Sequence, residues 1–275
     1  MTATSPTATA LDVTLDGVGM RFVGPRGEVT ALADFTLEAP AGSFTVLIGP
    51  NGCGKSTVLR LVAGLLAPSS GAVLVGGAPP RTGDGRVSLA FQQPRLVPWR
   101  STLDNVALPL EIDGVGPAER RGRATDALER VGLAGSADLR PRELSGGMAQ
   151  RAALARALIT DPGVLLLDEP FSALDALTRE TFDRELQALW EERRRTVILV
   201  THSVSEAIIL ADRVVVMTPR PGRVARVVDV DLPRPRPVEL AADPRAAMLA
   251  TGVREALAET RAVELRPWAE QEGTT

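Results

Sequence analysis

The sequence predicts an α/β fold with a mainly parallel sheet, and three observations support this prediction. Short continuous apolar runs, such as SFTVLIG, VLLLD and RTVILV, are typical of strands buried on both faces of a sheet. These runs alternate with segments of helical spacing, as parallel strands and their crossover helices do. Between about residues 94 and 148, proline, glycine and charged residues instead interrupt helical patterns, which predicts an inserted helical subdomain.

The first part of the chain is expected to form antiparallel strands. Residues 11–48 alternate apolar and polar positions in short runs separated by turn residues, which predicts an antiparallel β subdomain. Residues 1–10 have neither a basic start nor an apolar segment, so we expect a disordered leader and not a secretory signal. The run SFTVLIG then ends in a glycine-rich loop, which the helical pattern KSTVLRLVAGLL follows.

Helices and strands alternate again after the predicted lobe. The segment GGMAQRAALARALI and residues 176–194 are helical in spacing, and the second of these helices gathers apolar side chains on one face. RTVILVTH predicts a buried strand and VSEAIILAD a short helix, and residues 213–232 predict a hairpin around a Pro-Gly pair. The residues of the apolar helix face are Phe182, Leu186, Leu189 and Trp190.

The predicted organisation is one domain followed by a tail. The domain covers residues 11–222, and its helical lobe lies at about 94–148. The segment LPRPRPVE is typical of an extended proline-rich linker, and it belongs to a tail over residues 223–275. A last weak helix is expected near residues 244–262.

Composition excludes several classes of protein. The chain has 275 residues and a net charge of −3, so it lacks the basic surplus that is typical of nucleic-acid binding. Its one cysteine cannot form an intrachain disulfide. The longest apolar runs are too short to span a bilayer. We therefore expect a cytoplasmic chain that meets a membrane through a partner.

Residues 49–57 fit a phosphate-binding loop. Gly49, Gly54, Lys55 and Ser56 match the pattern G-x-x-x-x-G-K-[ST], between a buried strand and a helix. The glycines let successive N–H groups face a phosphate at the positive end of the helix, and the Ser56 hydroxyl suits Mg²⁺. The alternative is a glycine-rich turn without a ligand. The predicted phosphate-binding residues are Gly49, Pro50, Asn51, Gly52, Cys53, Gly54, Lys55, Ser56 and Thr57.

The lysine of this loop is unusual for the chain. Lys55 is the one lysine among 31 basic residues. A compact ammonium on a flexible stem can reach between phosphates, whereas a wider planar guanidinium would be crowded there. This difference explains why a sequence that otherwise uses arginine carries a lysine at position 55.

Two acidic residues follow a buried strand in the segment VLLLDEP. Asp168 is placed to hold the shell of a Mg²⁺ ion, and Glu169 can orient and deprotonate an attacking water. The alternative is an ordinary buried strand that ends in surface acids.

A third candidate site is the start of the helix after the lobe. In LSGGMAQR, Ser145 is a plausible N-cap, and Gly146 and Gly147 let exposed N–H groups approach an anion. The alternative is a helix cap without a ligand. Because this segment lies far along the chain from Lys55, it can serve a phosphate that is held by another subunit.

Together these segments resemble the ATP-binding cassette ATPases. GPNGCGKST resembles the phosphate loop of that family, LSGGMAQR its signature and LLLDEP its second nucleotide motif. SALD (172–175) resembles the D-loop, AFQQ the Q-loop and VTHS the H-loop. All six occur in the order of the family, over about residues 11–220. The resemblance implies a P-loop NTPase of RecA-like fold that uses ATP and Mg²⁺.

The resemblance also implies roles for single residues. His202, the one histidine of the chain, would contact the γ-phosphate and hold the attacking water with Glu169; an isolated histidine after a strand is otherwise a satisfied core residue. Gln92, which we choose over Gln93, would be the Q-loop residue. The other implied assignments are Asp175 as an ATP contact, and Ser56, Gln92 and Asp168 as the Mg²⁺ site, with Asp168 acting through water.

The resemblance leaves the adenine contact open. The family stacks an aromatic ring on adenine, and the chain has no tyrosine. Phe22 is the candidate, and its alternative is a place in the core of a strand.

The family resemblance further implies partners. Two chains would associate head to tail, with each ATP held between Lys55 of one protomer and Ser145–Gly147 of the other. QQPRLVPWRSTLDNVALPL and the tail resemble importers of the nitrate, sulfonate, taurine and bicarbonate group, which implies an integral membrane permease and, indirectly, a substrate-binding protein. Trp99 would line the groove for a permease helix, or else pack within the lobe. The chain would then lie at the cytoplasmic face of the cell membrane.

Two alternatives to this function remain. Importers of pyrimidine precursors share much of the same sequence pattern. A soluble, non-transport ATPase of the same fold, for example one for cluster assembly, is the second alternative.

Overall fold

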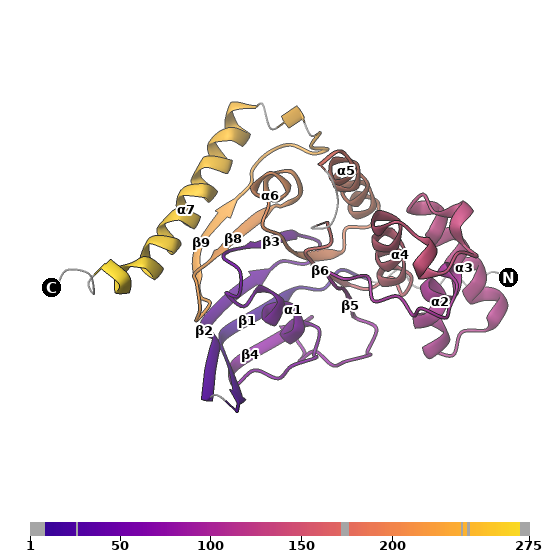
Figure 1. Cartoon of the computed structure of the whole chain (residues 1–275), viewed down its shortest axis with the longest axis horizontal. Coiled ribbons are helices and arrows are strands. Elements are labelled where there is room, and N and C mark those ends of the chain that lie inside the picture. The colour runs from indigo at the N-terminus through magenta and orange to yellow at the C-terminus, as the bar shows by residue number, and fades with distance from the viewer. Residues whose placement is uncertain (1–8, 26, 172–175, 238, 241–242, 270–275) are drawn as a thin grey trace.

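The computed structural model describes residues 9–25, 27–171, 176–237, 239–240 and 243–269. Within these ranges the strands form two sheets, with helices on both sides of the larger one (Figure 1). Most of the leader expected at residues 1–10 and all of the D-loop, 172–175, lie outside the described residues.

The larger sheet has six strands in the order β5-β6-β7-β3-β8-β9. All neighbours in it are parallel except β8 and β9, which form the antiparallel pair expected at 213–232. Every residue of β3, β6 and β7 is buried, because both faces of these strands are covered by other elements. The mainly parallel α/β fold is thus confirmed. The strands are β3 (Phe44–Ile48), β5 (Val87–Ala90), β6 (Val164–Asp168), β7 (Thr196–Val200), β8 (Arg213–Met217) and β9 (Val224–Asp229).

A smaller antiparallel sheet packs against one face of the larger one. Its order is β2-β1-β4, with Val13 of β1 opposite both Ala39 of β2 and Val75 of β4. Apolar residues of this sheet share a core cluster with the helix α1 and with alternate residues of the central strands. The predicted antiparallel β subdomain is therefore present. Its strands are β1 (Val13–Gly24), β2 (Gly27–Ala39) and β4 (Ser70–Val75), and α1 is Lys55–Val62.

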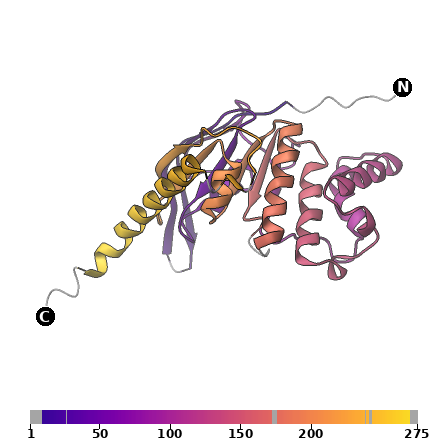
Figure 2. The same ribbon diagram turned by 90° about the horizontal axis from the view of Figure 1, so that it is seen from above.

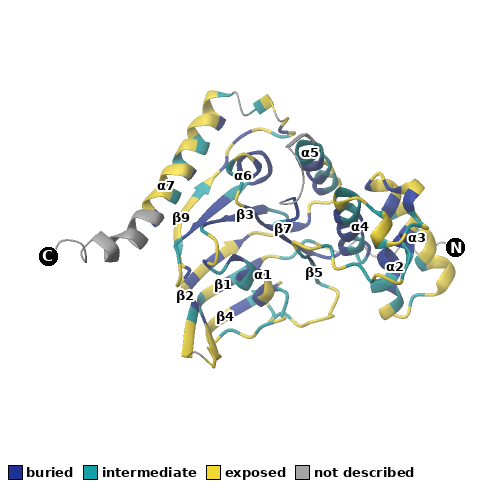
Figure 3. Ribbon diagram, in the orientation of Figure 1, coloured by how far each residue is buried: buried dark blue, intermediate teal, exposed yellow. Residues whose placement is uncertain are grey.

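The opposite face of the central sheet is covered by α5, α6 and α7. The other alternate residues of the central strands, such as Val46 and Leu165, pack there in a second cluster. Figure 3 shows this arrangement as buried central strands between helices whose outer faces are exposed. The terminal helix α7 extends beyond the predicted end at residue 262, because helix-forming residues continue where the apolar pattern no longer marks an end. The helices are α5 (Ala176–Glu192), α6 (Val204–Leu210) and α7 (Pro244–Ala269).

The inserted helices lie at the end of the molecule opposite α7 (Figure 2). Leu103, Val106 and Leu128 of this group form a third core cluster, which also takes in Ala155 and Ile159 beyond the predicted end of the lobe at 148. Ser101 caps the first of these helices by accepting a hydrogen bond from the Asp104 N–H. The helices are α2 (Thr102–Ile112), α3 (Pro117–Arg130) and α4 (Gly146–Leu158).

Trp190 lies on the buried face of α5. Replacing it with alanine is expected to lower the free energy of unfolding by about 3–5 kcal/mol. It is fully buried with Phe182 and Leu186 on the predicted apolar face, its ring contacts Phe44 edge-on at 5.9 Å, and its Nε1 donates to the Arg195 carbonyl at 2.9 Å. Trp190→Ala loses both the packing and the hydrogen bond, whereas Trp190→Phe retains most of the packing. Urea unfolding of the two variants would contradict this prediction if both lost the same stability.

Candidate functional site

The loop between β3 and α1 is shaped by glycines. Gly52 and Gly54 have φ values of 76° and 107°, which residues with side chains rarely adopt. A Cβ at position 54 would also lie 2.7 Å from Leu32 Cδ2 and 3.1 Å from the Ala31 carbonyl oxygen. A residue with a side chain at position 54 is therefore disfavoured for two reasons: the positive φ, and the steric overlap of its Cβ with β2.

Lys55 lies inside this loop. Its side chain is only 5% exposed, and its Nζ donates to the carbonyl oxygens of Gly49 at 2.9 Å and Pro50 at 3.0 Å. These two carbonyls hold the ammonium at the first helical position of α1, where the backbone N–H groups already favour an anion. The loop can therefore bind phosphate through N–H groups and one compact cation.

A cavity of 310 Å³ adjoins the loop. It is lined by Asn51, Gly52 and Gly54–Thr57 of the loop, together with Phe22, Glu169 and Arg220 from three other parts of the chain. Phe22 is 38% exposed at this cavity, so its alternative place in the core of a strand is wrong. An exposed ring on a cavity wall is available for stacking, and stacking on adenine stays a prediction.

Ser56, which lines the cavity, contacts Asp168. The Ser56 hydroxyl donates to Asp168 Oδ1 at 2.9 Å, although the two residues come from α1 and β6. Burial raises the pKa of Asp168 above its ordinary value; the Ser56 hydrogen bond lowers that pKa, and the charge of Glu169 raises it. A hydroxyl and a carboxylate at this distance are the oxygen ligands that Mg²⁺ prefers, so these residues fit the ion.

Glu169 lies between two other predicted site residues. Its Oε2 accepts a hydrogen bond from Gln92 Nε2 at 3.2 Å and lies 3.8 Å from His202 Nδ1. Its backbone has φ +44°, an unfavourable conformation for a residue with a side chain, and its N–H donates to the Val200 carbonyl at 3.0 Å. The structure thus brings Gln92, Glu169 and His202 together at the ends of three neighbouring strands.

A buried acidic residue holds the segment around His202. Glu206 of α6 accepts a hydrogen bond from the Thr201 hydroxyl at 2.5 Å, and the Ser203 N–H donates to the same hydroxyl at 3.0 Å. Arg179 Nε of α5 lies 3.5 Å from Glu206 Oε1. Glu206 is therefore a positioning group behind His202, and it lies outside every motif from which the site was predicted.

Asp183 is a second buried acidic residue near Glu206. Its raised pKa predicts that the stability of the protein depends on pH. Burial, together with the charge of Glu206, raises the pKa of Asp183 from 3.8 to about 8. The folded protein therefore binds a proton that the unfolded chain loses near pH 4, so stability falls as the pH rises toward 8. Asp183→Asn removes this titration, and we expect it to be about 1–3 kcal/mol more stable than the wild type at pH 8.5, with a smaller difference at pH 5. Urea unfolding at both pH values tests this, with the exposed Asp138→Asn as control, and equal pH slopes for all three proteins would contradict it.

The residues at the start of α4 stand apart from this cavity. Ser145 caps the helix by accepting a hydrogen bond from the Met148 N–H at 3.2 Å, and both Ser145 and Gly146 are exposed. Neither they nor Gly147 line the cavity around Lys55. Asp175, the remaining predicted ATP contact, lies outside the described residues.

Comparison with known proteins decides the family. A sequence model described as "ABC transporter" matches residues 32–172, which span the phosphate loop, the signature and the acidic pair. The chain belongs to the ABC transporter family. As an ABC ATPase it binds and hydrolyses ATP, as predicted from its motifs. Within the described residues, no helix is both long enough and apolar enough to span a bilayer.

Several proteins with similar sequences are named as ATP-binding proteins of importers. This ABC ATPase is 44% identical to the nitrate import ATP-binding protein NrtD of Synechococcus elongatus, over 91% of this chain and 94% of that protein. It is 47% identical to the aliphatic sulfonates import ATP-binding protein SsuB of Pectobacterium atrosepticum, over 84% and 83%. It is 44% identical to the taurine import ATP-binding protein TauB of Burkholderia thailandensis, over 79% and 84%.

A solved structure supports the same assignment. A dimeric ATP-binding cassette in a post-hydrolysis state, bound to ADP and Pi, superposes on the ABC ATPase with a TM-score of 0.73 and 32% identity. The match covers 80% of this chain and 99% of that one.

Three cavity residues of the ABC ATPase were missed by sequence reasoning: Val29, Ala31 and the charged Arg220. Arg220, in the loop between β8 and β9, lines the cavity and donates from Nε and Nη2 to the Gly52 carbonyl at 3.3 and 3.2 Å. The same loop contains Gly222, whose N–H donates to the Ala31 carbonyl at 2.9 Å and where a Cβ would lie 2.0 Å from the Cys53 carbonyl oxygen. The Pro-Gly pair predicted a turn here, but nothing in the sequence indicated that the turn touches the phosphate loop.

Proposed function

We propose that the chain is the ATP-hydrolysing subunit of an importer for a small anion such as nitrate, a sulfonate, taurine or bicarbonate. The observation that carries this proposal is the identity of 44–47% with three import ATP-binding proteins for such solutes, over most of each chain. In this proposal the chain lies at the cytoplasmic face of the cell membrane, bound to a permease that also receives solute from a separate binding protein. An importer of pyrimidine precursors and a soluble cluster-assembly ATPase are the alternatives.

In the proposed mechanism Glu169 is the general base. Its carboxylate adjoins the cavity of the phosphate loop and accepts from Gln92, so it is placed to take a proton from a water that attacks the γ-phosphate. His202 approaches the same carboxylate, and we assign to it the orientation of that water and a contact with the γ-phosphate. Lys55 and the N–H groups of the loop bind the phosphates and stabilise the charge that develops during transfer.

The Mg²⁺ site of the proposal uses oxygen atoms of three residues. Ser56 would hold the ion directly, Asp168 through water, and Gln92 through its side-chain carbonyl. Bound there, the ion would neutralise charge on the phosphate oxygens. The hydrogen bond between Ser56 and Asp168 keeps the two groups oriented toward one point.

A head-to-tail dimer completes the proposed ATP site. Ser145, Gly146 and Gly147 carry N–H groups at the start of α4 but do not line the cavity of their own chain. The exposure of Ser145 and Gly146 supports a role toward ATP in the partner subunit, with Asp175 as a further assigned contact. The dimeric cassette of similar structure supports assembly as a dimer.

The proposed permease contact involves Trp99. Its side chain is 76% exposed before α2, so the alternative of packing within the lobe is wrong. A large exposed aromatic residue is typical of an interface, and it supports a groove for a permease helix at this side of the lobe.

Reconstitution tests the importer proposal. The chain would be co-expressed with the permease and the binding protein of the proposed importer, and ATP hydrolysis by the complex in vesicles would be measured with nitrate, taurine, butanesulfonate, bicarbonate or orotate. Stimulation by one of the first four supports the proposal, and stimulation by orotate alone favours the pyrimidine alternative. Recovery of the chain in a stable complex with soluble proteins only would contradict a transport role. Trp99→Ser should lower recovery with the membrane fraction, whereas the exposed Met248→Ser on α7 should not.

A further inference from the structure

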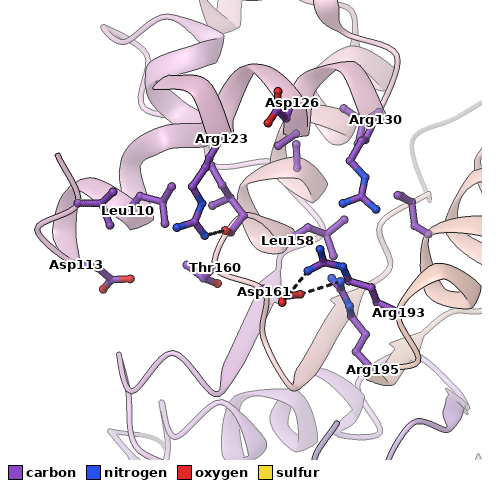
Figure 4. A pocket seen from close by; sticks show the side chains of 16 residues that line it. Leu110, Asp113, Arg123, Asp126, Arg130, Leu158, Thr160, Asp161, Arg193 and Arg195 are labelled. Atoms are coloured by element: carbon purple, nitrogen blue, oxygen red, sulfur yellow. Dashed lines mark hydrogen bonds and ion pairs between the residues drawn. The ribbon is translucent and has the colours of Figure 1, made fainter. Parts of the chain in front are cut away.

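A second cavity, of 560 Å³, lies between the inserted helices and the central sheet (Figure 4). Its walls come from α2, α3 and α4 on one side, and from the end of α5 and the segment between α5 and β7 on the other. None of its lining residues lines the cavity of the phosphate loop. The volume is within the range of about 300–1,000 Å³ that is typical of small-molecule sites.

One end of this cavity carries more cations than carboxylates. Arg193 Nη1 and Arg195 Nη2 both reach Asp161, at 2.8 and 3.3 Å, so one carboxylate is shared by two guanidinium groups. Arg130 points toward them from α3 in Figure 4, and its ion-pair partner is Glu192. The three guanidinium groups at this end thus share two ion-pair partners, Asp161 and Glu192, which leaves one positive charge in excess among these five groups. Over the whole lining, four arginines stand against the three aspartates Asp113, Asp126 and Asp161.

Arg195 is the buried member of this group, and its burial increases the attraction that its charge exerts on an anion in the cavity. Its side chain is 8% exposed, and its Nε and Nη1 have no hydrogen-bond partner among the residues that the structure describes. Burial lowers the pKa of Arg195; Asp161 opposes this shift, and the charges of Arg193 and Arg130 add to it. A buried charge acts on the cavity through a low-dielectric path, so it attracts an anion more strongly than an exposed charge does.

The accessible donors come from both sides of the cavity. Arg193 and Arg130 are partly exposed, and Arg123 of α3 also lines the cavity while its Nη2 donates to the Ile159 carbonyl at 2.9 Å. Thr160 presents a hydroxyl on the same wall (Figure 4). Planar guanidinium groups with a nearby hydroxyl match the oxygens of a carboxylate, sulfonate or phosphate.

Most of the remaining wall is apolar and includes the side chains of Leu110, Val115, Ala127, Val131, Leu158 and Leu189, and the carboxylates of Asp113 and Asp126 also line the cavity. A bare inorganic anion would leave this apolar surface in contact with water, whereas a short hydrocarbon chain would cover it.

We propose that this cavity binds a small organic oxyanion, with its charged group at Arg130 and Arg193 and a short hydrocarbon portion against the apolar wall. Such a ligand connects α3 of the inserted helices to the residues that lead into β7. The proposal is independent of nucleotide binding, because no residue that lines this cavity also lines the cavity of the phosphate loop.

Calorimetric titration of the full-length protein tests the proposal, with butanesulfonate, methanesulfonate and inorganic phosphate as probes. Because the phosphate loop also attracts anions, each titration is repeated with saturating Mg·ADP. We expect butanesulfonate to bind with a Kd of about 1 mM or below with and without ADP, and to bind at least about fivefold more tightly than methanesulfonate and phosphate.

Matched variants locate the site. Arg130→Ala with Arg193→Ala should weaken butanesulfonate binding by about tenfold or more, whereas Arg184→Ala with Arg226→Ala removes the same charge from exposed positions elsewhere and should change it less than about twofold. If the first double variant fails to fold, Arg130→Gln with Arg193→Gln replaces it, with thermal melting as the check. Absence of binding, loss of binding with ADP, equal effects of the two double variants, or equal affinity for all three probes would each overturn the proposal.

Discussion

Glu169→Gln is expected to slow ATP hydrolysis by roughly 10²–10⁴-fold while ATP still binds. The amide has nearly the shape of the carboxylate, so the positions of Gln92 and His202 around it are retained. It cannot accept the proton of the attacking water, and the loss corresponds to about 3–5 kcal/mol of activation free energy. ATP would then persist in the site, and the variant should accumulate as a dimer.

Two measurements check this expectation. Phosphate release under saturating Mg·ATP gives the rate, and size-exclusion chromatography with ATP gives the oligomeric state. Glu259→Gln, an exposed position on α7, is the control for the same chemical change far from the cavity. Turnover of Glu169→Gln at the wild-type rate would refute the assignment of the base.

Lys55→Arg is expected to weaken Mg·ATP binding by roughly 10²-fold or more, although the charge is conserved. The side chain is almost fully buried, and the carbonyls of Gly49 and Pro50 lie at 2.9 and 3.0 Å from its ammonium. A guanidinium is wider and planar, so it would either displace these carbonyls or extend into the space of the phosphates. Both outcomes deform the loop that presents the N–H groups.

The control for Lys55→Arg is the reverse exchange on the same helix. Arg60 lies at an exposed position in the last turn of α1. The variant Arg60→Lys should therefore bind Mg·ATP like the wild type. Equilibrium binding of a fluorescent ATP analogue gives both affinities. Wild-type affinity in Lys55→Arg would show that the position needs only a positive charge.

Prediction from the sequence worked best where the residues of a motif restrict the local backbone conformation. The pattern of glycines in residues 49–54, between a buried strand and a helix, sufficed to predict the loop, whereas the burial of Lys55 in it came only from the structure. The meeting of Gln92, Glu169 and His202 was also accessible, because all three follow parallel strands whose ends lie at one edge of the sheet. Burial of Trp190 followed from helical spacing in the same way.

The rest depended on contacts between distant segments. Arg220 reaches Gly52 because the loop between β8 and β9 folds over the phosphate loop, and no local pattern records that approach. The cavity at Arg193 and Arg195 requires the inserted helices to pack near the end of α5, and no local sequence pattern indicates that approach. The exposure of Phe22 was undecided for the same reason, since either face of its strand was available to it.

Gly222 has a consequence for engineering the nucleotide site. Since a Cβ there would overlap the Cys53 carbonyl oxygen, the outer wall of the phosphate loop is the bare backbone of a turn far along the chain. Transplanting residues 49–57 into another scaffold would leave that wall behind, and the graft would keep its sequence without its curvature. A working transplant must carry the turn from Thr218 to Arg223 as well, so the smallest portable unit has at least two segments.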